Sequence, residues 1–204
     1  LDRNNNVLAL DVRSFSVGID LKNFKGNILN MESLEEILSV KKETISGLIK
    51  NKKTGFKEIK RHVSGTLKRD IENLELEGVF FRENLRRSYP QKEVSSHVVG
   101  ITDIDRKGIQ GSELVFDNTL KGKKGKFTGI KSSGNKKIEG YRIEPQNGKD
   151  LFLTIDIRLQ SIAFEELSKA IEETGAESGS VIIINPQSAE ILAQSNHPSF
   201  NPSD

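Results

Sequence analysis

The stretch Arg86-Arg87-Ser88-Tyr89-Pro90 follows a segment in which Val79, Phe81 and Leu85 stand an even number of residues apart. Even spacing of this kind is typical of one face of a strand. We therefore predict a strand that begins after Gly78 and has Arg86 and Arg87 at its end. Its shared face carries Val79, Phe81, Glu83 and Leu85.

The residues before this strand predict further short elements. We expect two short strands in residues 1–20, broken near Arg13 and Ser14. One or two helices are expected in 33–50, opened by a capping box of Ser33 and Glu36. A strand over 56–63 and a helix over 64–74 complete this half of the chain.

The residues after Pro90 become rich in glycine and then regain a regular pattern. Six glycines punctuate residues 121–149, which favours hairpins over helix. Beyond them we predict a strand over 151–155, a helix over 157–173 that Gly175 ends, and paired strands over 179–185 and 189–195. The expected fold class is α+β, with one domain over 1–148 and a second over 149–204.

The composition narrows the possible functions. The 204 residues include 31 Lys or Arg and 29 Asp or Glu. The charges nearly balance, so the protein lacks the strong positive electrostatic field that is typical of a polyanion-binding protein. Two segments are locally basic, 41–69 with ten Lys or Arg and 121–137 with seven Lys. We interpret both as solvated surfaces.

Metal, thiol and membrane-spanning features do not stand out. The chain has no cysteine, and His62, His97 and His197 each lack a second ligand at metal spacing, so we predict neither a metal nor a cofactor. The longest aliphatic run, 181–184, is far shorter than the roughly 20 residues of a membrane span. The opening residues read as a trimmed start, with any anchor expected upstream.

Two Ser-x-x-Lys tetrads match the motif that carries the nucleophilic serine in penicillin-recognising enzymes. Ser39 precedes Lys42 by three residues and Ser133 precedes Lys136, and a Lys-Thr-Gly triplet stands at 53–55. A real site needs the serine at the start of a buried helix, with the triplet on a neighbouring sheet edge. We expect Ser39 inside a helix and Ser133 in a loop, so neither is a predicted nucleophile.

Four groups of residues, in chain order, carry a family resemblance. The first is Asp2-Arg3-Asn4-Asn5. The second is Arg87-Ser88-Tyr89-Pro90 with 94–100. The third is Gly108-Ile109-Gln110-Gly111-Ser112-Glu113, and the fourth begins with the run 153–160 and ends at 198–202.

Together these groups resemble the non-catalytic region and the transpeptidase entry of class B penicillin-binding proteins. Only 17 residues separate Pro90 from Gly108, which is closer to the division-type branch, the FtsI-type enzymes, than to the elongation type. Three glycines of the family pattern are replaced, by Asn5, Lys92 and Ala189. Either those turns have changed type or they hold side chains at positive φ, at a cost of about 1 kcal/mol each.

The resemblance implies what the parent protein does. It would be a serine D,D-transpeptidase that cross-links peptidoglycan, and this chain would be its elongated pedestal followed by the start of the transpeptidase domain, without the nucleophile. It would stand on the periplasmic face of the bacterial inner membrane. Expected partners are the septal glycosyltransferase of the FtsW type and other division proteins, with no nucleic acid.

The motif residues are expected to be structural. We hypothesise that Glu113 joins Arg3 to Arg87, because a guanidinium fork matches a carboxylate bidentately. Asp156 is predicted to cap the following helix and Gln160 to face the pedestal junction. The remaining motif positions assigned to the framework are Tyr89, Pro90, Gly108 and Gly111.

Other readings stay open. A polyanion-binding domain would use the two basic segments, although each holds a single Phe and neither holds Tyr or Trp for base stacking. An elongation-type relative is a third possibility. Strands 150–156, 179–185 and 189–195 are expected to leave edges unpaired, which makes a homodimer of the chain conceivable.

Overall fold

The computed structural model describes residues 1–41, 43–50, 55–131 and 138–203 and has an α+β fold, as predicted. Its contacts divide the chain into two compact units. Unit 1 combines residues 1–10 with 88–204, and unit 2 is 11–87. Residues 149–204 thus belong to the same unit as residues 88–148. The domain boundary that the sequence predicts near residue 148 stays a prediction.

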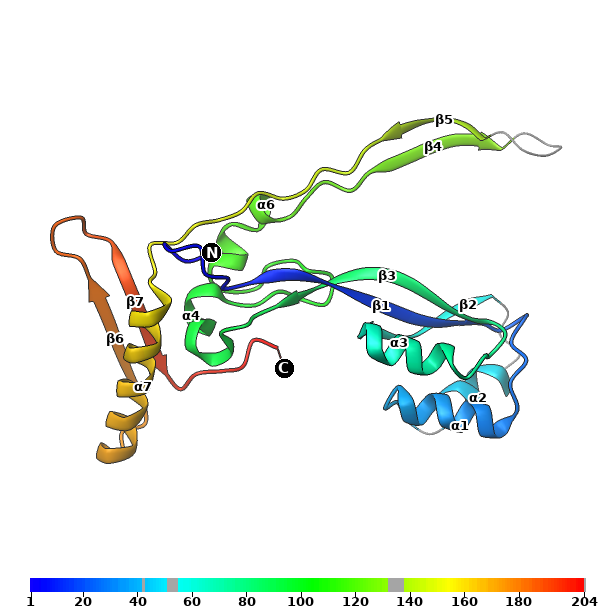
Figure 1. The fold of residues 1–204 in the computed structure, drawn as a ribbon, viewed down its shortest axis with the longest axis horizontal. Coiled ribbons are helices and arrows are strands. Elements are labelled where there is room, and N and C mark those ends of the chain that lie inside the picture. The colour runs from blue at the N-terminus through cyan, green and yellow to red at the C-terminus, as the bar shows by residue number, and fades with distance from the viewer. Residues whose placement is uncertain (42, 51–54, 132–137, 204) are drawn as a thin grey trace. The chain divides into compact units, whose positions relative to one another are not determined.

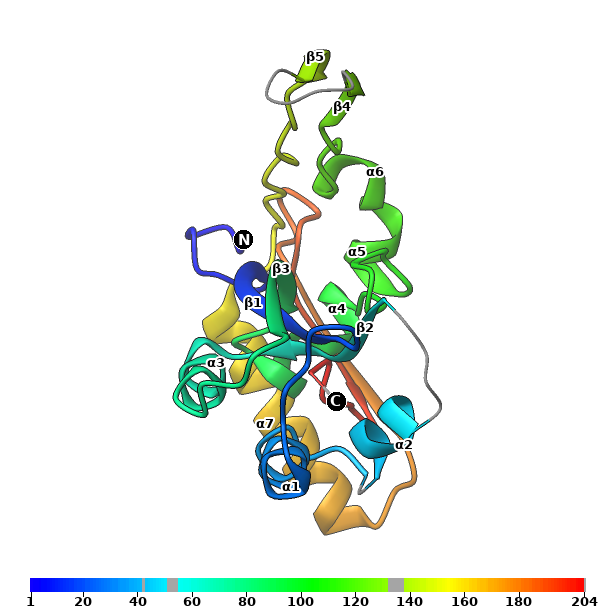
Figure 2. The same cartoon turned by 90° about the vertical axis from the view of Figure 1, so that its right-hand side faces the viewer.

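Unit 2 contains a three-stranded sheet and three helices. The strand order is β2 (Phe56–Val63), β1 (Leu10–Asp20), β3 (Val79–Ser88). The helices α1 (Ile28–Ile37), α2 (Thr44–Lys50) and α3 (Gly65–Glu72) lie on the same side of the sheet (Figures 1 and 2). The strands at 56–63 and after Gly78 and the helix after Ser64 are confirmed.

The core of unit 2 is wholly aliphatic and closed to solvent. Every buried member is at most 1% exposed, a level reached because the strands and helices each contribute one apolar face. Around them pack partly buried residues that include Phe15, Phe24 and Phe81. The buried members are Val17, Ile19, Leu34, Leu38, Ile45, Val63 and Ile71.

Two sequence predictions for unit 2 are wrong. Residues 10–20 form one continuous strand that does not break at Arg13, because β1 is the central strand and has a neighbour on each side, β2 and β3. Helix α1 begins earlier than Ser33, since Asn27 and Asn30 form the capping box, each side chain accepting from the other's backbone N–H at 2.9 and 3.1 Å. Ser33 therefore lies inside the helix.

Unit 1 contains a helix packed on a two-stranded sheet and a group of short helices. Helix α7 (Ile157–Thr174) lies against the antiparallel pair β6 (Gly179–Ile184) and β7 (Ile191–His197) (Figure 1). Gly175 ends α7 at φ 68°, as predicted. The short helices are η1 (Lys92–Ser95), α4 (Ser96–Val99), α5 (Gly111–Val115) and α6 (Asp117–Leu120).

The glycine-rich stretch forms the expected hairpin. Strands β4 (Lys126–Lys131) and β5 (Ile138–Ile143) pair antiparallel in a two-stranded sheet. The predicted strand at 151–155 is not regular. That segment is extended, and its backbone bonds to residues 1–3 and, through Asp156, to Leu192, so it joins two neighbours without a continuous ladder.

Candidate functional site

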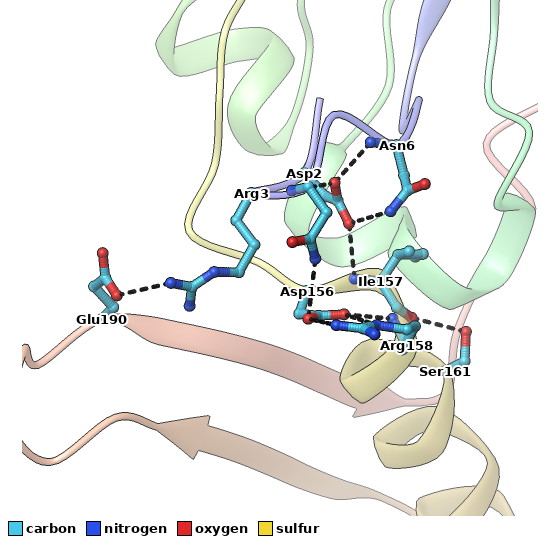
Figure 3. A network of polar contacts seen from close by, with 9 residues as sticks. Asp2, Arg3, Asn6, Asp156, Ile157, Arg158, Ser161 and Glu190 are labelled. Carbon is cyan, nitrogen blue, oxygen red and sulfur yellow. Dashed lines mark hydrogen bonds and ion pairs between the residues drawn. The ribbon is translucent and has the colours of Figure 1, made fainter.

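The polar junction of unit 1 is centred on Asp2, which is fully buried. Its carboxylate accepts the N–H groups of Asn4 (2.8 Å), Asn6 (2.7 Å) and Ile157 (3.2 Å) and the Asn6 side chain (2.9 Å). Burial opposes its ionisation, but these hydrogen bonds outweigh burial and leave the pKa of Asp2 below its ordinary value. One carboxylate thereby ties the first motif to the start of α7 (Figure 3).

Asp156 caps α7, as the sequence predicted. One of its oxygens accepts the Arg158 N–H at 3.0 Å, and the other accepts the Arg158 guanidinium at 2.7 Å and the Asn4 amide at 3.1 Å. The Arg158 side chain holds the pKa of Asp156 well below its usual range, against the effect of burial. The cap and the Asp2 loop meet through Asn4, whose N–H donates to Asp2 and whose side-chain amide donates to Asp156.

Gln160, one turn further along α7, is 1% exposed and joins three elements. Its amide nitrogen donates to the carbonyls of Val94 in η1 and Gln194 in β7, both at 2.8 Å, and its oxygen accepts the Gln194 N–H at 2.9 Å. Both the nitrogen and the oxygen of its side-chain amide are therefore hydrogen-bonded inside the protein. Gln160 thus links α7 to η1 and β7, and its expected place at the pedestal junction stays a prediction.

The second and third motifs pack together. Tyr89 is 4% exposed, and its hydroxyl accepts the Thr102 N–H at 3.0 Å. The Tyr89 carbonyl accepts the Lys92 N–H, which closes a turn that contains the exposed Pro90. Gly111, at φ 62°, lies where an added Cβ would come within 2.7 Å of the Gly100 nitrogen. A Cβ on Gly108 would come within 2.0 Å of the Glu113 carbonyl oxygen, so both glycines are required for this close packing.

The three charged motif residues have different surroundings. Arg3 forms an ion pair with Glu190 at 3.4 Å (Figure 3), and Arg87 forms one with Asp11 at 3.3 Å. Glu113 is 4% exposed at the start of α5. Glu190 is a partner that the sequence did not indicate, and the hypothesis that Glu113 joins the two arginines stays a prediction.

The three residues that replace family glycines keep the glycine conformation. Asn5, Lys92 and Ala189 have φ values of 66°, 45° and 57°. The alternative of side chains held at positive φ is therefore confirmed. Asparagine tolerates this region better than lysine or alanine.

A contact that the sequence did not indicate joins the second motif to residues 198–200. The His97 ring packs edge-on against Phe200 at 5.2 Å between ring centres, and its Nε2 lies 3.0 Å from the Pro198 carbonyl oxygen. The Ser199 hydroxyl lies 2.9 Å from the Glu93 carbonyl oxygen and 3.0 Å from the Ser96 hydroxyl. Nothing in the local pattern around His97 marks so distant a partner.

The acylation decoys are only partly described. Ser39 lies in the turn after α1 at φ 49°, so the expectation that it lies inside a helix is wrong, because α1 ends at Ile37. Lys42, Lys53, Thr54, Ser133 and Lys136 fall outside the described residues. Within the described ranges, no three His, Asp or Glu side chains are grouped to hold a metal ion.

The comparisons with known proteins agree with this architecture. The family model of the penicillin-binding protein dimerisation domain matches residues 1–153. The chain belongs to this family, the N-terminal dimerisation domains of class B penicillin-binding proteins.

Several of its relatives are peptidoglycan D,D-transpeptidases by name. The chain is 34% identical over 208 residues to the probable peptidoglycan D,D-transpeptidase PenA of Neisseria gonorrhoeae, covering 98% of this chain and 36% of that protein. It is 35% identical over 175 residues to the peptidoglycan D,D-transpeptidase FtsI of Escherichia coli, covering 85% and 30%. Stage V sporulation protein D of Bacillus subtilis is 30% identical over 210 residues, covering all of this chain and 32% of that protein.

The chain thus spans about a third of the length of these relatives. A crystal structure of penicillin-binding protein 2X from Streptococcus thermophilus shares its fold, with a TM-score of 0.65 at 22% identity over 98% of this chain and 34% of that chain. That likeness supports the α+β fold.

Proposed function

We propose that the chain is the scaffold of a division-type peptidoglycan D,D-transpeptidase and carries no nucleophile of its own. The observation that carries this proposal is the polar junction, in which the buried carboxylate of Asp2 holds the first motif on the N-terminus of α7. A buried network of this kind fixes geometry more than it adds stability. Its role would be to hold the transpeptidase entry at a set position on the motif region.

The division assignment is supported by two facts. The interval of 17 residues between Pro90 and Gly108 lacks the longer insertion of the elongation type. FtsI of Escherichia coli is among the relatives at 35% identity. A sporulation protein at 30% identity keeps other specialisations open as outcomes of the test.

Partners and location belong to the same proposal. The scaffold would present faces to a septal glycosyltransferase of the FtsW type and to other division proteins, at the periplasmic face of the inner membrane. No helix among the described residues is both long and apolar enough to cross a bilayer. Nucleic acid is not an expected ligand, because the formal net charge is only +2.

Fluorescent penicillin tests the catalytic part of the proposal. A protein in which this chain is joined to a complete transpeptidase domain should become covalently labelled, whereas the 204-residue chain should not. Labelling of the isolated chain would place a nucleophile within it and end the proposal. Depletion of the gene product should give filaments, and round cells would instead assign the elongation role.

A further inference from the structure

The hairpin of unit 1 continues well beyond its two strands as one backbone-paired ribbon. Lys123 and Gln146 exchange two backbone hydrogen bonds of 2.8 and 2.9 Å, and the Lys149 N–H donates to the Thr119 carbonyl at 2.9 Å. We call residues 121–131 and 138–149 the basic ribbon; β4 and β5 form its outer part (Figure 1).

Glycines allow the two legs of the basic ribbon to approach this closely. A Cβ on Gly148 would come within 1.7 Å of the Leu120 carbonyl oxygen, and one on Gly122 within 2.2 Å of the Gln146 carbonyl oxygen. No side chain fits into either space. The two glycines therefore make the close pairing of the two legs possible, and the ribbon is a regular element rather than an irregular loop.

The ribbon exposes large apolar side chains. Tyr141 is 74% exposed, Phe127 56% and Ile143 47%. Tyr141 and Ile143 are two residues apart on β5 and share a face, whereas Phe127 pairs with Arg142 on the other face. A single exposed apolar residue needs no explanation, but a two-stranded hairpin is only marginally stable in water without a surface to pack on.

The charge of the ribbon selects the kind of partner. Residues 121–131 and 138–149 contain seven Lys or Arg and two Glu. Lys121 pairs with Asp117 and Arg142 with Glu144, but the exposed Lys123, Lys124 and Lys126 have no ion pair with any described residue. A complementary partner is acidic, and attraction of this kind raises the association rate.

The open edges narrow the partner further. Among the described residues, β4 and β5 pair only with each other, so each has one edge of unpaired backbone N–H and C=O groups. A polypeptide strand can pair with such an edge, whereas a lipid headgroup or a glycan offers no matching row of amides. Lysines along an edge also repel a second copy of the same ribbon.

We propose that the basic ribbon docks an acidic, extended segment of a partner protein, which adds as a third strand and covers the side chains of Tyr141 and Ile143. The inference concerns binding alone and does not depend on the transpeptidase assignment. Its success or failure is therefore separate from the penicillin-labelling test.

Fluorescence anisotropy of the 204-residue chain with a short synthetic peptide that alternates glutamate and valine tests the proposal. Saturable binding that weakens with salt is expected. The same peptide with N-methylated alternate amides keeps its charge but cannot pair with an edge, so it should bind about tenfold more weakly or less. Equal binding of the two peptides would overturn strand addition.

Two sets of variants locate the site. Lys123→Glu, Lys124→Glu and Lys126→Glu together should weaken peptide binding by about tenfold or more. The matched control, Lys22→Glu, Lys41→Glu and Lys57→Glu, has the same net charge and changes three exposed lysines outside the ribbon, so its affinity should stay within about twofold. Loss of affinity in both sets would show a general charge effect and contradict the proposal.

Hydrogen exchange keeps the test valid if a variant folds poorly. In the unaltered chain, the peptide should slow exchange in β4 or β5 and leave β6 and β7 unchanged. Tyr141→Ser with Ile143→Ser should reduce affinity without changing the salt dependence. Binding of vesicles rich in anionic lipid in place of the peptide would assign the ribbon to membranes and overturn the protein partner.

Discussion

Unit 2 and the polar junction of unit 1 are built on opposite principles. Unit 2 closes an aliphatic core in which every buried member is at most 1% exposed. The junction instead buries Asp2, Gln160 and Asp156, whose polar atoms are satisfied by hydrogen bonds across long stretches of chain. Apolar packing tolerates exchanges between apolar side chains of similar volume, whereas a hydrogen-bonded network accepts only one geometry. The motif residues gather where geometry is fixed.

Truncation of a buried side chain in the aliphatic core of unit 2 should destabilise the protein more than any other change. Leu38→Ala removes a side chain that is 0% exposed, and it should lower the free energy of unfolding by about 3–4 kcal/mol through lost burial and the cavity left behind. Denaturant unfolding measures it. Leu29→Ala, at a position 71% exposed, is the control and should change stability by less than about 0.5 kcal/mol.

On the polar side, Asp2→Ala should cost about 2–3 kcal/mol, because it leaves buried N–H groups without an acceptor. Hydrogen exchange should accelerate at residues 1–10 and at the start of α7 but not in the core of unit 2. Asp70→Ala, at an exposed position, is the matched control. Uniform acceleration through both units would show that the junction has no local role.

Glu113→Gln probes the arginine hypothesis. If Glu113 joins Arg3 and Arg87, loss of its charge should lower stability by about 1–2 kcal/mol. A double-mutant cycle with Arg87→Ala should then give a coupling energy of at least about 0.5 kcal/mol. Strict additivity of the two changes would remove Glu113 from the network.

Acid should weaken the junction more than the aliphatic core. The pKa values of Asp2 and Asp156 are lowered in the folded state, so their contribution is complete above the unfolded value of about 3.9 and is lost as the pH falls below it. Melting curves between pH 7 and pH 3 measure this. The melting-temperature difference between the protein and its Asp156→Asn variant should shrink toward pH 3; a constant difference would contradict it.

The turn at Ala189 should give the smallest change in stability. Ala189→Gly removes a Cβ held at φ 57° and should stabilise the protein by about 0.5–1 kcal/mol. Differential scanning calorimetry should show a higher melting temperature. Ala163→Gly, inside α7, should act in the opposite direction, because glycine is unfavourable in a helix interior.

Sequence patterns located most of the elements because those elements depend on local chemistry. The cap at Asp156, the left-handed end at Gly175 and the strand after Gly78 follow from residues within one turn of the feature they create. The start of α1 was missed because its capping box uses Asn30 where glutamate is usual. The continuity of β1 was missed because a central strand is stabilised by neighbours on both sides rather than by its own alternation.

The family resemblance and the order of the motifs follow from the sequence alone, because both are carried by short runs of residues. At the three substituted turns the sequence left two alternatives, and the backbone angles of the structure distinguished them. The three-dimensional structure was needed to show that Asp2 bonds to Ile157, that Arg3 pairs with Glu190 and that His97 contacts residues 198–200. Those partners are separated by at least 101 positions. Local propensity carries no information over such distances, and only the packed core brings the groups together.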